Sequence, residues 1–140
     1  MSKVSIVYWS GTGNTQKMAE AVAEGVKEAG AEADLKFVSA ATVDELAAEP
    51  AFALGCPSMG AEQLEESEFE PMFEEVKTKL GGKRIGLFGS YGWGDGEWMR
   101  IWEDDCSKLG CTMAAGPVLA NGAPDDTAAE ECRALGGALA

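Results

Sequence analysis

Residues 8–15 read Tyr8-Trp9-Ser10-Gly11-Thr12-Gly13-Asn14-Thr15, and this stretch decides the expected fold. It follows an apolar run, Val4–Trp9, and precedes an amphipathic helical pattern, so it predicts a strand, a tight loop and a helix N-terminus. Backbone N–H groups at such a junction point into one concavity at the positive end of the helix dipole, which suits a phosphate. The loop contains no Lys or Arg, so neutral donors would hold the anion.

Two familiar phosphate-binding motifs are absent from this loop. The P-loop string Gly-x-x-x-x-Gly-Lys-Ser/Thr does not occur, and the dinucleotide fingerprint Gly-x-Gly-x-x-Gly fails because Gln16 occupies its third glycine position. A glycine-rich turn that binds nothing is the plainer alternative. The side-chain donors of Ser10, Thr12, Asn14 and Thr15, placed directly after a hydrophobic strand, favour a binding loop.

Length and charge restrict the class of protein. The length of 140 residues predicts a single domain, 1–140, which is large enough to fold without stabilising disulfides or metals. The net charge of −13 argues against nucleic-acid binding and favours basic protein partners, although a role in solubility alone would explain the charge equally well. No apolar run approaches the ~20 residues of a membrane span, and the N-terminus lacks a signal-peptide layout. We expect a cytoplasmic protein without membrane association.

The cysteines do not form a metal or disulfide pattern. Cys56, Cys106, Cys111 and Cys132 include no Cys-x-x-Cys pair, and the chain has no histidine. We expect reduced thiols packed in the core.

Strand and helix patterns alternate along the whole chain. The first, third and fourth apolar runs are nearly continuous, as in central parallel strands, while the second alternates like an edge strand. The expected strands are Val4–Trp9, Ala33–Val38, Ala51–Gly55, Ile85–Gly89 and Met113–Leu119. Five βα units with short connections predict an α/β fold, a doubly wound parallel sheet whose ligand lies at the carboxyl ends of the strands.

Helix boundaries are marked by end signals. Gly30 is expected to end the first helix, and Thr42 with Glu45 forms a capping box for the second. Pro71 is expected in the first turn of the third, which Gly81-Gly82 would stop. A Thr127–Glu130 box is expected to cap the last helix.

Two further loops carry unusual residues. Gly55–Glu62 contains Met59-Gly60, which suits the centre of a type II turn and places a soft apolar side chain where it could lie on a flat ring. An ordinary loop with an exposed Met is equally compatible. In Gly89–Trp98, glycines alternate with Tyr91 and Trp93, so Trp93 is expected to be a stacking platform. The alternative is that Trp93 packs in the core, as Trp98 and Trp102 should.

Together these loops predict a ligand with one phosphate and a flat ring. Flavin mononucleotide (FMN) fits well. Adenine nucleotides fit less well, because a polyphosphate carries more charge than a site without a nearby cation tolerates.

Three strings, Ser10–Thr15, Cys56–Gly60 and Gly89–Gly94, resemble flavodoxins, specifically the short-chain kind of anaerobic bacteria. The resemblance covers essentially the whole chain. It implies a flavodoxin-like, three-layer α/β/α fold with a five-stranded sheet in the order 2-1-3-4-5. It also implies a low-potential one-electron carrier with non-covalently bound FMN, shuttling between semiquinone and hydroquinone and substituting for ferredoxin.

The resemblance also implies the site. Ser10–Thr15 would hold the phosphate, Met59 and Trp93 would cover the two ring faces, and Glu62 would bond the ring N3–H. The implied cofactor-binding residues are Ser10, Gly11, Thr12, Gly13, Asn14, Thr15, Pro57, Ser58, Met59, Gly60, Ala61, Glu62, Gly89, Ser90, Tyr91, Gly92, Trp93 and Gly94. Ala61 departs from the Asp of some relatives.

Acidic residues near these loops affect the reduction potential expected of the flavin and the partner proteins expected to bind. The second electron makes the flavin ring anionic, and a protein of net charge −13 disfavours this negative charge. The reduction potential of the step from semiquinone to hydroquinone should therefore be low. We expect a monomer that meets basic surfaces of reductases and ferredoxin-dependent enzymes. The residues expected around the ring edge are Glu62, Glu65, Glu66, Asp95 and Glu97.

Three alternatives remain at this stage. A flavin-dependent NAD(P)H or quinone reductase would need space beside the ring, which Met59 and Trp93 would block. A receiver domain would need aspartates at the ends of the first and third strands, where Trp9-Ser10 and Gly55-Cys56 stand. A binding module that has lost its flavin conflicts with three intact loops. Without a nucleophile–base pair or a metal cluster, the chain is expected to be a carrier and not an enzyme.

Overall fold

The computed structural model describes residues 3–11, 13–59, 64–92 and 96–140. Its strands are β1 (Lys3–Tyr8), β2 (Glu32–Phe37), β3 (Ala51–Gly55), β4 (Arg84–Tyr91), β5 (Thr112–Met113) and β6 (Val118–Asn121). Its α-helices are α1 (Asn14–Glu28), α2 (Val43–Ala48), α3 (Phe69–Val76), α4 (Glu97–Lys108) and α5 (Asp126–Leu139). Short 3-10 helices, η1 (Val38–Ala40) and η2 (Lys77–Lys79), follow β2 and α3.

The sheet is parallel, and its order β2-β1-β3-β4-β5 confirms the expected topology. In the register of the three inner strands, Tyr8 lies beside Gly55, and Gly55 lies beside Phe88. The loops after β1, β3 and β4 therefore leave the sheet at one edge. Strand β3 is buried at all five positions, as its continuous apolar run predicts.

The fifth strand is not the single run Met113–Leu119 that the sequence suggested. Strand β5 pairs with Arg84 and Ile85 at the start of β4, whereas β6 pairs with the Phe88–Tyr91 end of the same strand. Gly116-Pro117 lies between the two pieces. Proline has no N–H to donate to a sheet, and this explains the interruption.

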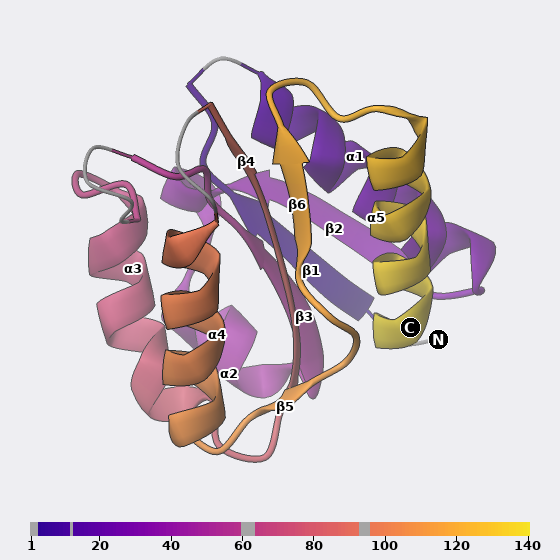
Figure 1. The fold of residues 1–140 in the computed structure, drawn as a ribbon. Coiled ribbons are helices and arrows are strands. Elements are labelled where there is room, and N and C mark those ends of the chain that lie inside the picture. The colour runs from indigo at the N-terminus through magenta and orange to yellow at the C-terminus, as the bar shows by residue number, and fades with distance from the viewer. Residues whose placement is uncertain (1–2, 12, 60–63, 93–95) are drawn as a thin grey trace.

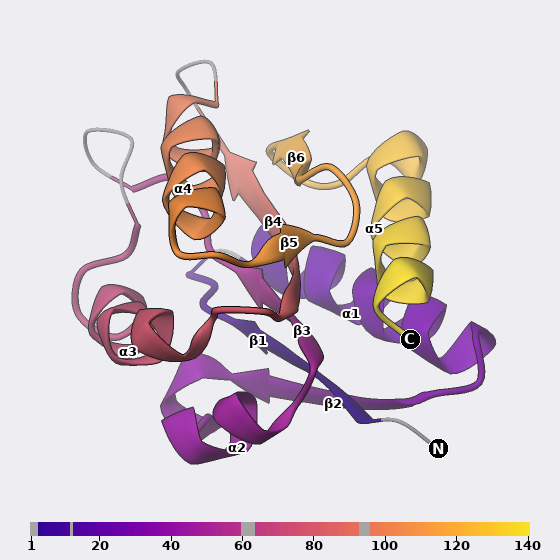
Figure 2. The same cartoon turned by 90° about the horizontal axis from the view of Figure 1, so that it is seen from below.

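Helices cover both faces of the sheet (Figure 1). Figure 2 shows α1 and α5 on one side and α2, α3 and α4 on the other. Each face has its own apolar core: Phe69, Phe73 and Trp102 belong to one, Met18 and Leu135 to the other. Trp98 and Trp102 are buried, as expected. All four cysteines are buried and free, which confirms the expectation of packed thiols.

Helices α1 and α5 touch through glycines. A Cβ added at Gly136 would lie 2.1 Å from the carbonyl oxygen of Val22, and one at Gly25 would lie 1.9 Å from that of Arg133. Only glycine allows the two backbones to approach this closely.

Most helix ends follow their sequence signals. Thr42 accepts a hydrogen bond from the Glu45 N–H at 3.2 Å, which confirms the capping box, and Gly30 has a positive φ just after α1. Pro71 lies in the first turn of α3, but that helix ends at Val76 and continues as η2. The cap of α5 was predicted wrongly.

The actual cap of α5 is Asp125, whose side chain accepts from the Ala128 N–H at 2.8 Å. A carboxylate caps a helix at least as well as a threonine, so the helix begins before Thr127. Within the described ranges, no helix is long and apolar enough to cross a membrane.

Candidate cofactor-binding site

A cavity of about 250 Å³ opens where the loops after the inner strands meet. The loop after β1 contributes Trp9, Gly11 and Asn14, and the loop after β3 contributes Pro57, Ser58 and Met59. Ser90 and Tyr91 at the end of β4, and Gly92 just after it, also line the cavity. The predicted residues Ser10, Gly13, Thr15 and Gly89 are not among the described residues that line it. The structure thus brings residues of all three predicted loops to one place.

The loop after β1 leaves donors free at the start of α1. Gly13 is the N-cap with a φ of 95°, and no side chain of a described residue caps the helix. Ser10 Oγ accepts from the Gly13 N–H at 3.0 Å, which holds the loop in shape. Thr15 Oγ1 is buried without a hydrogen-bond partner within the described structure. A buried hydroxyl without a partner is costly, and a hydrogen-bond acceptor bound at this loop would satisfy it.

This geometry fits a phosphate. A phosphate oxygen would accept from the Thr15 hydroxyl and from free amides of the first turn, at the positive end of the α1 dipole. Glycine at the N-cap position supplies the left-handed backbone that other residues rarely adopt.

Main-chain hydrogen bonds join the loops after β3 and β4. The Cys56 N–H donates to the Phe88 carbonyl at 3.1 Å, and the Ser58 N–H donates to the Ser90 carbonyl at 3.0 Å. Trp98, on α4, donates its indole N–H to the Cys56 carbonyl at 3.2 Å. These bonds fix the walls of the cavity against each other.

Part of the cavity wall is apolar. Trp9, Met59 and Tyr91 are each half-buried and line it. The Tyr91 ring lies 5.6 Å from the Trp98 ring, centroid to centroid, so the wall is backed by the core. Flat apolar surfaces of this kind suit a planar ring.

A fourth loop, which the sequence did not predict, also borders the cavity. Gly122, just after β6, lines the cavity, accepts from Ser90 Oγ at 2.7 Å through its carbonyl, and donates its N–H to the Tyr91 carbonyl at 2.9 Å. Asn121-Gly122 is a common turn dipeptide, and this signal could have identified the loop once the last strand was correctly bounded.

Gly89 has a different position from its neighbours. It lies buried in β4 and does not line the cavity. A Cβ there would lie 2.2 Å from the Cys56 carbonyl oxygen and 3.1 Å from the Trp98 ring. The close approach of the β3 loop and α4 accounts for this glycine.

Six predicted site residues lie outside the described residues. They are Thr12, Gly60, Ala61, Glu62, Trp93 and Gly94. Asp95, expected near the ring edge, also lies there.

Glu65, which was expected at the ring edge, is not among the described residues that line the cavity. Its carboxylate is buried and accepts from the amides of Ser67 and Glu68 at 2.8 Å and of Phe69 at 2.9 Å, which caps α3. Burial alone would raise the pKa of Glu65, but these hydrogen bonds, with that of the Ser67 hydroxyl, outweigh it and lower the pKa. Glu66 and Glu97 are exposed.

Comparison with known proteins shows the family of this chain. Residues 6–136 match the family model described as Flavodoxin. A curated flavodoxin from Clostridium beijerinckii is 49% identical over 137 residues, which cover 98% of this chain and 99% of that protein. One from Megasphaera elsdenii is 47% identical over 98% of each.

A solved structure agrees with the sequence relatives. The solution structure of two-electron reduced Megasphaera elsdenii flavodoxin matches with a TM-score of 0.89 and 47% identity, over 97% of both chains.

Proposed function

This chain belongs to the flavodoxin family, whose members carry electrons on bound FMN, and we propose that the cavity at the ends of β1, β3 and β4 holds its FMN. The supporting observation is a buried Thr15 hydroxyl at a helix N-terminus, without a partner among the described residues, next to Asn14, which lines a cavity with apolar walls. One end suits a phosphate and the other a flat ring. The protein is an electron carrier, not an enzyme with its own substrate.

The phosphate end is assigned to the loop after β1. Thr15 donates its hydroxyl, and Ser10 keeps the loop closed by accepting from Gly13. With no cation in Ser10–Thr15, the phosphate is held by neutral donors and the helix dipole. By family resemblance Thr12 and Asn14 add side-chain donors.

The ring end is assigned to the loops after β3 and β4. Met59 and Tyr91 form apolar walls, while Pro57, Ser58, Ser90 and Gly92 border the ring and its sugar chain. By resemblance, Gly60, Ala61, Glu62, Trp93 and Gly94 complete the enclosure, with Trp93 on the outer ring face. Apolar walls exclude water and so disfavour added negative charge on the ring.

Bound FMN supplies one-electron chemistry, and this chain tunes and directs it. The net charge of −13 opposes a further negative charge, which supports a low potential for the second electron. The same charge supports redox partners with basic surfaces, among them reductases and ferredoxin-dependent enzymes, because opposite charge accelerates encounter.

The cellular location and the assembly of the protein are also part of the proposal. Four free, buried thiols suit a reducing compartment, so we propose that the protein is cytoplasmic. We also propose that it is a monomer with one domain, 1–140.

A threonine swap tests the phosphate assignment. Thr15→Val should weaken FMN binding roughly tenfold or more, because a hydrogen bond to a charged group is lost. Its affinity for riboflavin, which lacks the phosphate, should not change. Thr127→Val is the matched control, since Thr127 is also the second residue of a helix, α5, and is exposed. Equal losses for FMN and riboflavin would contradict the assignment.

A further inference from the structure

The connection from β3 to α3 begins with three residues that line the candidate FMN cavity, Pro57, Ser58 and Met59. Cys56 directly precedes them, and Glu65 lies near the end of the same connection. Both are buried, Cys56 completely, and neither is among the described residues that line the cavity. An effect of these two residues on FMN would therefore be exerted through the residues that they hold in place.

The thiol of Cys56 joins the two ends of this connection. Its Sγ accepts from the Glu65 N–H at 3.3 Å and donates to the Pro57 carbonyl oxygen at 3.5 Å. Burial raises the pKa of the Cys56 thiol to about 12, so the thiol keeps the proton that the second bond needs. One side chain thus bonds a peptide group at the start of the connection and another at its end.

Glu65 is itself fixed to the first turn of α3. The amides of Glu68 and Phe69 donate to one oxygen of its carboxylate, and the amide and hydroxyl of Ser67 donate to the other. Its backbone carbonyl oxygen also accepts from the Glu70 N–H at 2.8 Å. Hydrogen bonds to an ionised carboxylate are stronger than those between neutral groups, so this turn holds Glu65 firmly.

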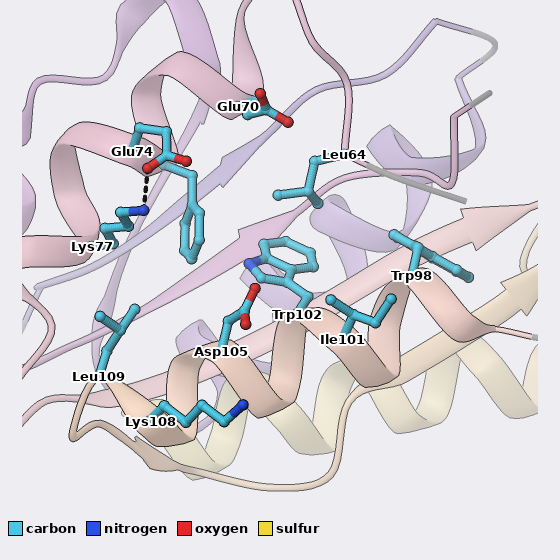
Figure 3. A pocket seen from close by; sticks show the side chains of 11 residues that line it. Leu64, Glu70, Glu74, Lys77, Trp98, Ile101, Trp102, Asp105, Lys108 and Leu109 are labelled. Atoms are coloured by element: carbon cyan, nitrogen blue, oxygen red, sulfur yellow. Dashed lines mark ion pairs between the residues drawn. The ribbon is translucent and has the colours of Figure 1, made fainter. Parts of the chain in front are cut away.

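The core beneath α3 and α4 anchors the same end of the connection. Phe69 is fully buried, and its ring meets the Trp102 ring edge to face, with centroids 5.5 Å apart. Leu64, directly before Glu65, packs against this core. Figure 3 shows Leu64 beside the Trp102 ring, where both line a cavity of about 560 Å³ between the two helices. Core packing therefore sets the position from which Glu65 bonds the Cys56 thiol.

We propose that Cys56 and Glu65 are a pair of positioning residues, which hold residues 57–59 in the arrangement that receives FMN. The inference rests on the proposed FMN cavity. The backbone of Cys56 is bonded to Phe88 and to the Trp98 indole, and its thiol adds a bond to the start of α3, so this cavity wall is held from two sides. A wall that is already ordered lowers the cost of ordering on binding, and most such differences in affinity appear in the dissociation rate.

Two matched cysteine variants test the pair on the FMN-loaded protein. Cys56→Ala removes the thiol, and Cys132→Ala removes an equally buried thiol from the core on the opposite face of the sheet. FMN release, followed by flavin fluorescence, should be roughly threefold faster in Cys56→Ala, from the loss of one hydrogen bond. Its first one-electron reduction potential should also shift, because Met59 borders the ring. Cys132→Ala should lose stability as well, yet keep the release rate and the potential of the parent.

The outcomes separate this inference from the proposed function. Equal release rates in the two cysteine variants, or an unchanged potential in Cys56→Ala, would overturn the positioning role while FMN binding by the parent stands. A parent protein that takes up no FMN would overturn the proposed function itself.

A change at the other member of the pair tests the inference even if Cys56→Ala does not fold. Glu65→Gln places an amide N–H₂ where the carboxylate accepts backbone donors, so it weakens the anchor on α3 and should also speed FMN release. Glu70→Gln removes an exposed carboxylate of the same helix and should leave the rate unchanged. In Cys56→Ala/Glu65→Gln the rate increase should be smaller than the product of the two single increases, because both changes act through one contact. Equal rates for Glu65→Gln and Glu70→Gln, or independent effects in the double variant, would contradict the pairing.

Discussion

The indole N–H of Trp98 donates to the carbonyl oxygen of Cys56 at 3.2 Å, and this bond ties α4 to the loop after β3. Trp98 also contacts Tyr91, so a single side chain supports two walls of the FMN cavity from behind. The order of the cavity therefore depends on core packing as well as on the loops themselves.

Replacing this tryptophan should cost both stability and cofactor affinity. Trp98→Phe leaves the Cys56 carbonyl without its donor and creates a gap, so the free energy of unfolding should fall by about 2–4 kcal/mol. FMN should bind more weakly. Trp102→Phe is the comparison: its N–H has no partner in the described structure, so it should retain FMN affinity. Denaturant unfolding and fluorescence titration measure the two effects, and equal FMN losses in both variants would contradict this account.

Two adjacent glycines of α5 should respond in opposite ways to alanine. Gly136→Ala places a Cβ 2.1 Å from the Val22 carbonyl oxygen and should destabilise by about 1–3 kcal/mol. At Gly137 an added Cβ meets nothing within 4 Å, so Gly137→Ala should stabilise by about 0.5–1 kcal/mol, because alanine is the better helix former. Urea unfolding of the pair gives both signs, and a stable Gly136→Ala would show that α1 and α5 are not in such close contact.

The Glu65 cap predicts a pH-dependent difference in stability. Its folded pKa is lowered, so the ionised carboxylate contributes stability above its unfolded pKa of about 4.3, and this contribution is lost as pH falls through the folded pKa. Glu65→Gln should be less stable than the parent near neutral pH, and the difference should shrink as the pH falls below about 4. Glu70→Gln, which replaces an exposed carboxylate of the same helix, is the control for the substitution itself. A constant difference across this range would contradict the assignment.

Surface charge should govern the rate of electron transfer to a basic partner. Electron transfer to cytochrome c, a basic redox protein, should slow as salt is added, because salt screens the electrostatic attraction that brings the two proteins together. A Glu66→Gln/Glu97→Gln double variant removes two exposed charges near the cavity loops and should be slower at low salt, with the difference vanishing at high salt. A Glu20→Gln/Glu24→Gln variant on α1 is the control. Stopped-flow rates independent of salt would refute the steering argument.

Local signals predicted much of this fold, and their failures have identifiable physical causes. The continuous apolar run of β3 set its bounds at Ala51–Gly55, and the Thr42–Glu45 box set the start of α2. The last strand was misjudged because apolar residues continue through Gly116-Pro117, where the missing proline N–H breaks the sheet.

Tertiary context decided the remaining details. Glu65 looked like a surface acid, and no sequence period shows that its carboxylate turns back onto three amides of its own chain. Gly89 looked like part of a binding loop, yet the nearness of Cys56 and Trp98 explains it. Gly122 was missed because its place beside Ser90 depends on how the split last strand returns to β4.

The most direct test of the central claim is an anaerobic reductive titration of the FMN-loaded protein, followed by visible absorption. We predict two separate one-electron steps, with the long-wavelength absorption of a one-electron-reduced flavin rising in the first and falling in the second. Direct bleaching in a single two-electron step, or failure of the protein to take up FMN, would contradict the account of this chain as a one-electron carrier.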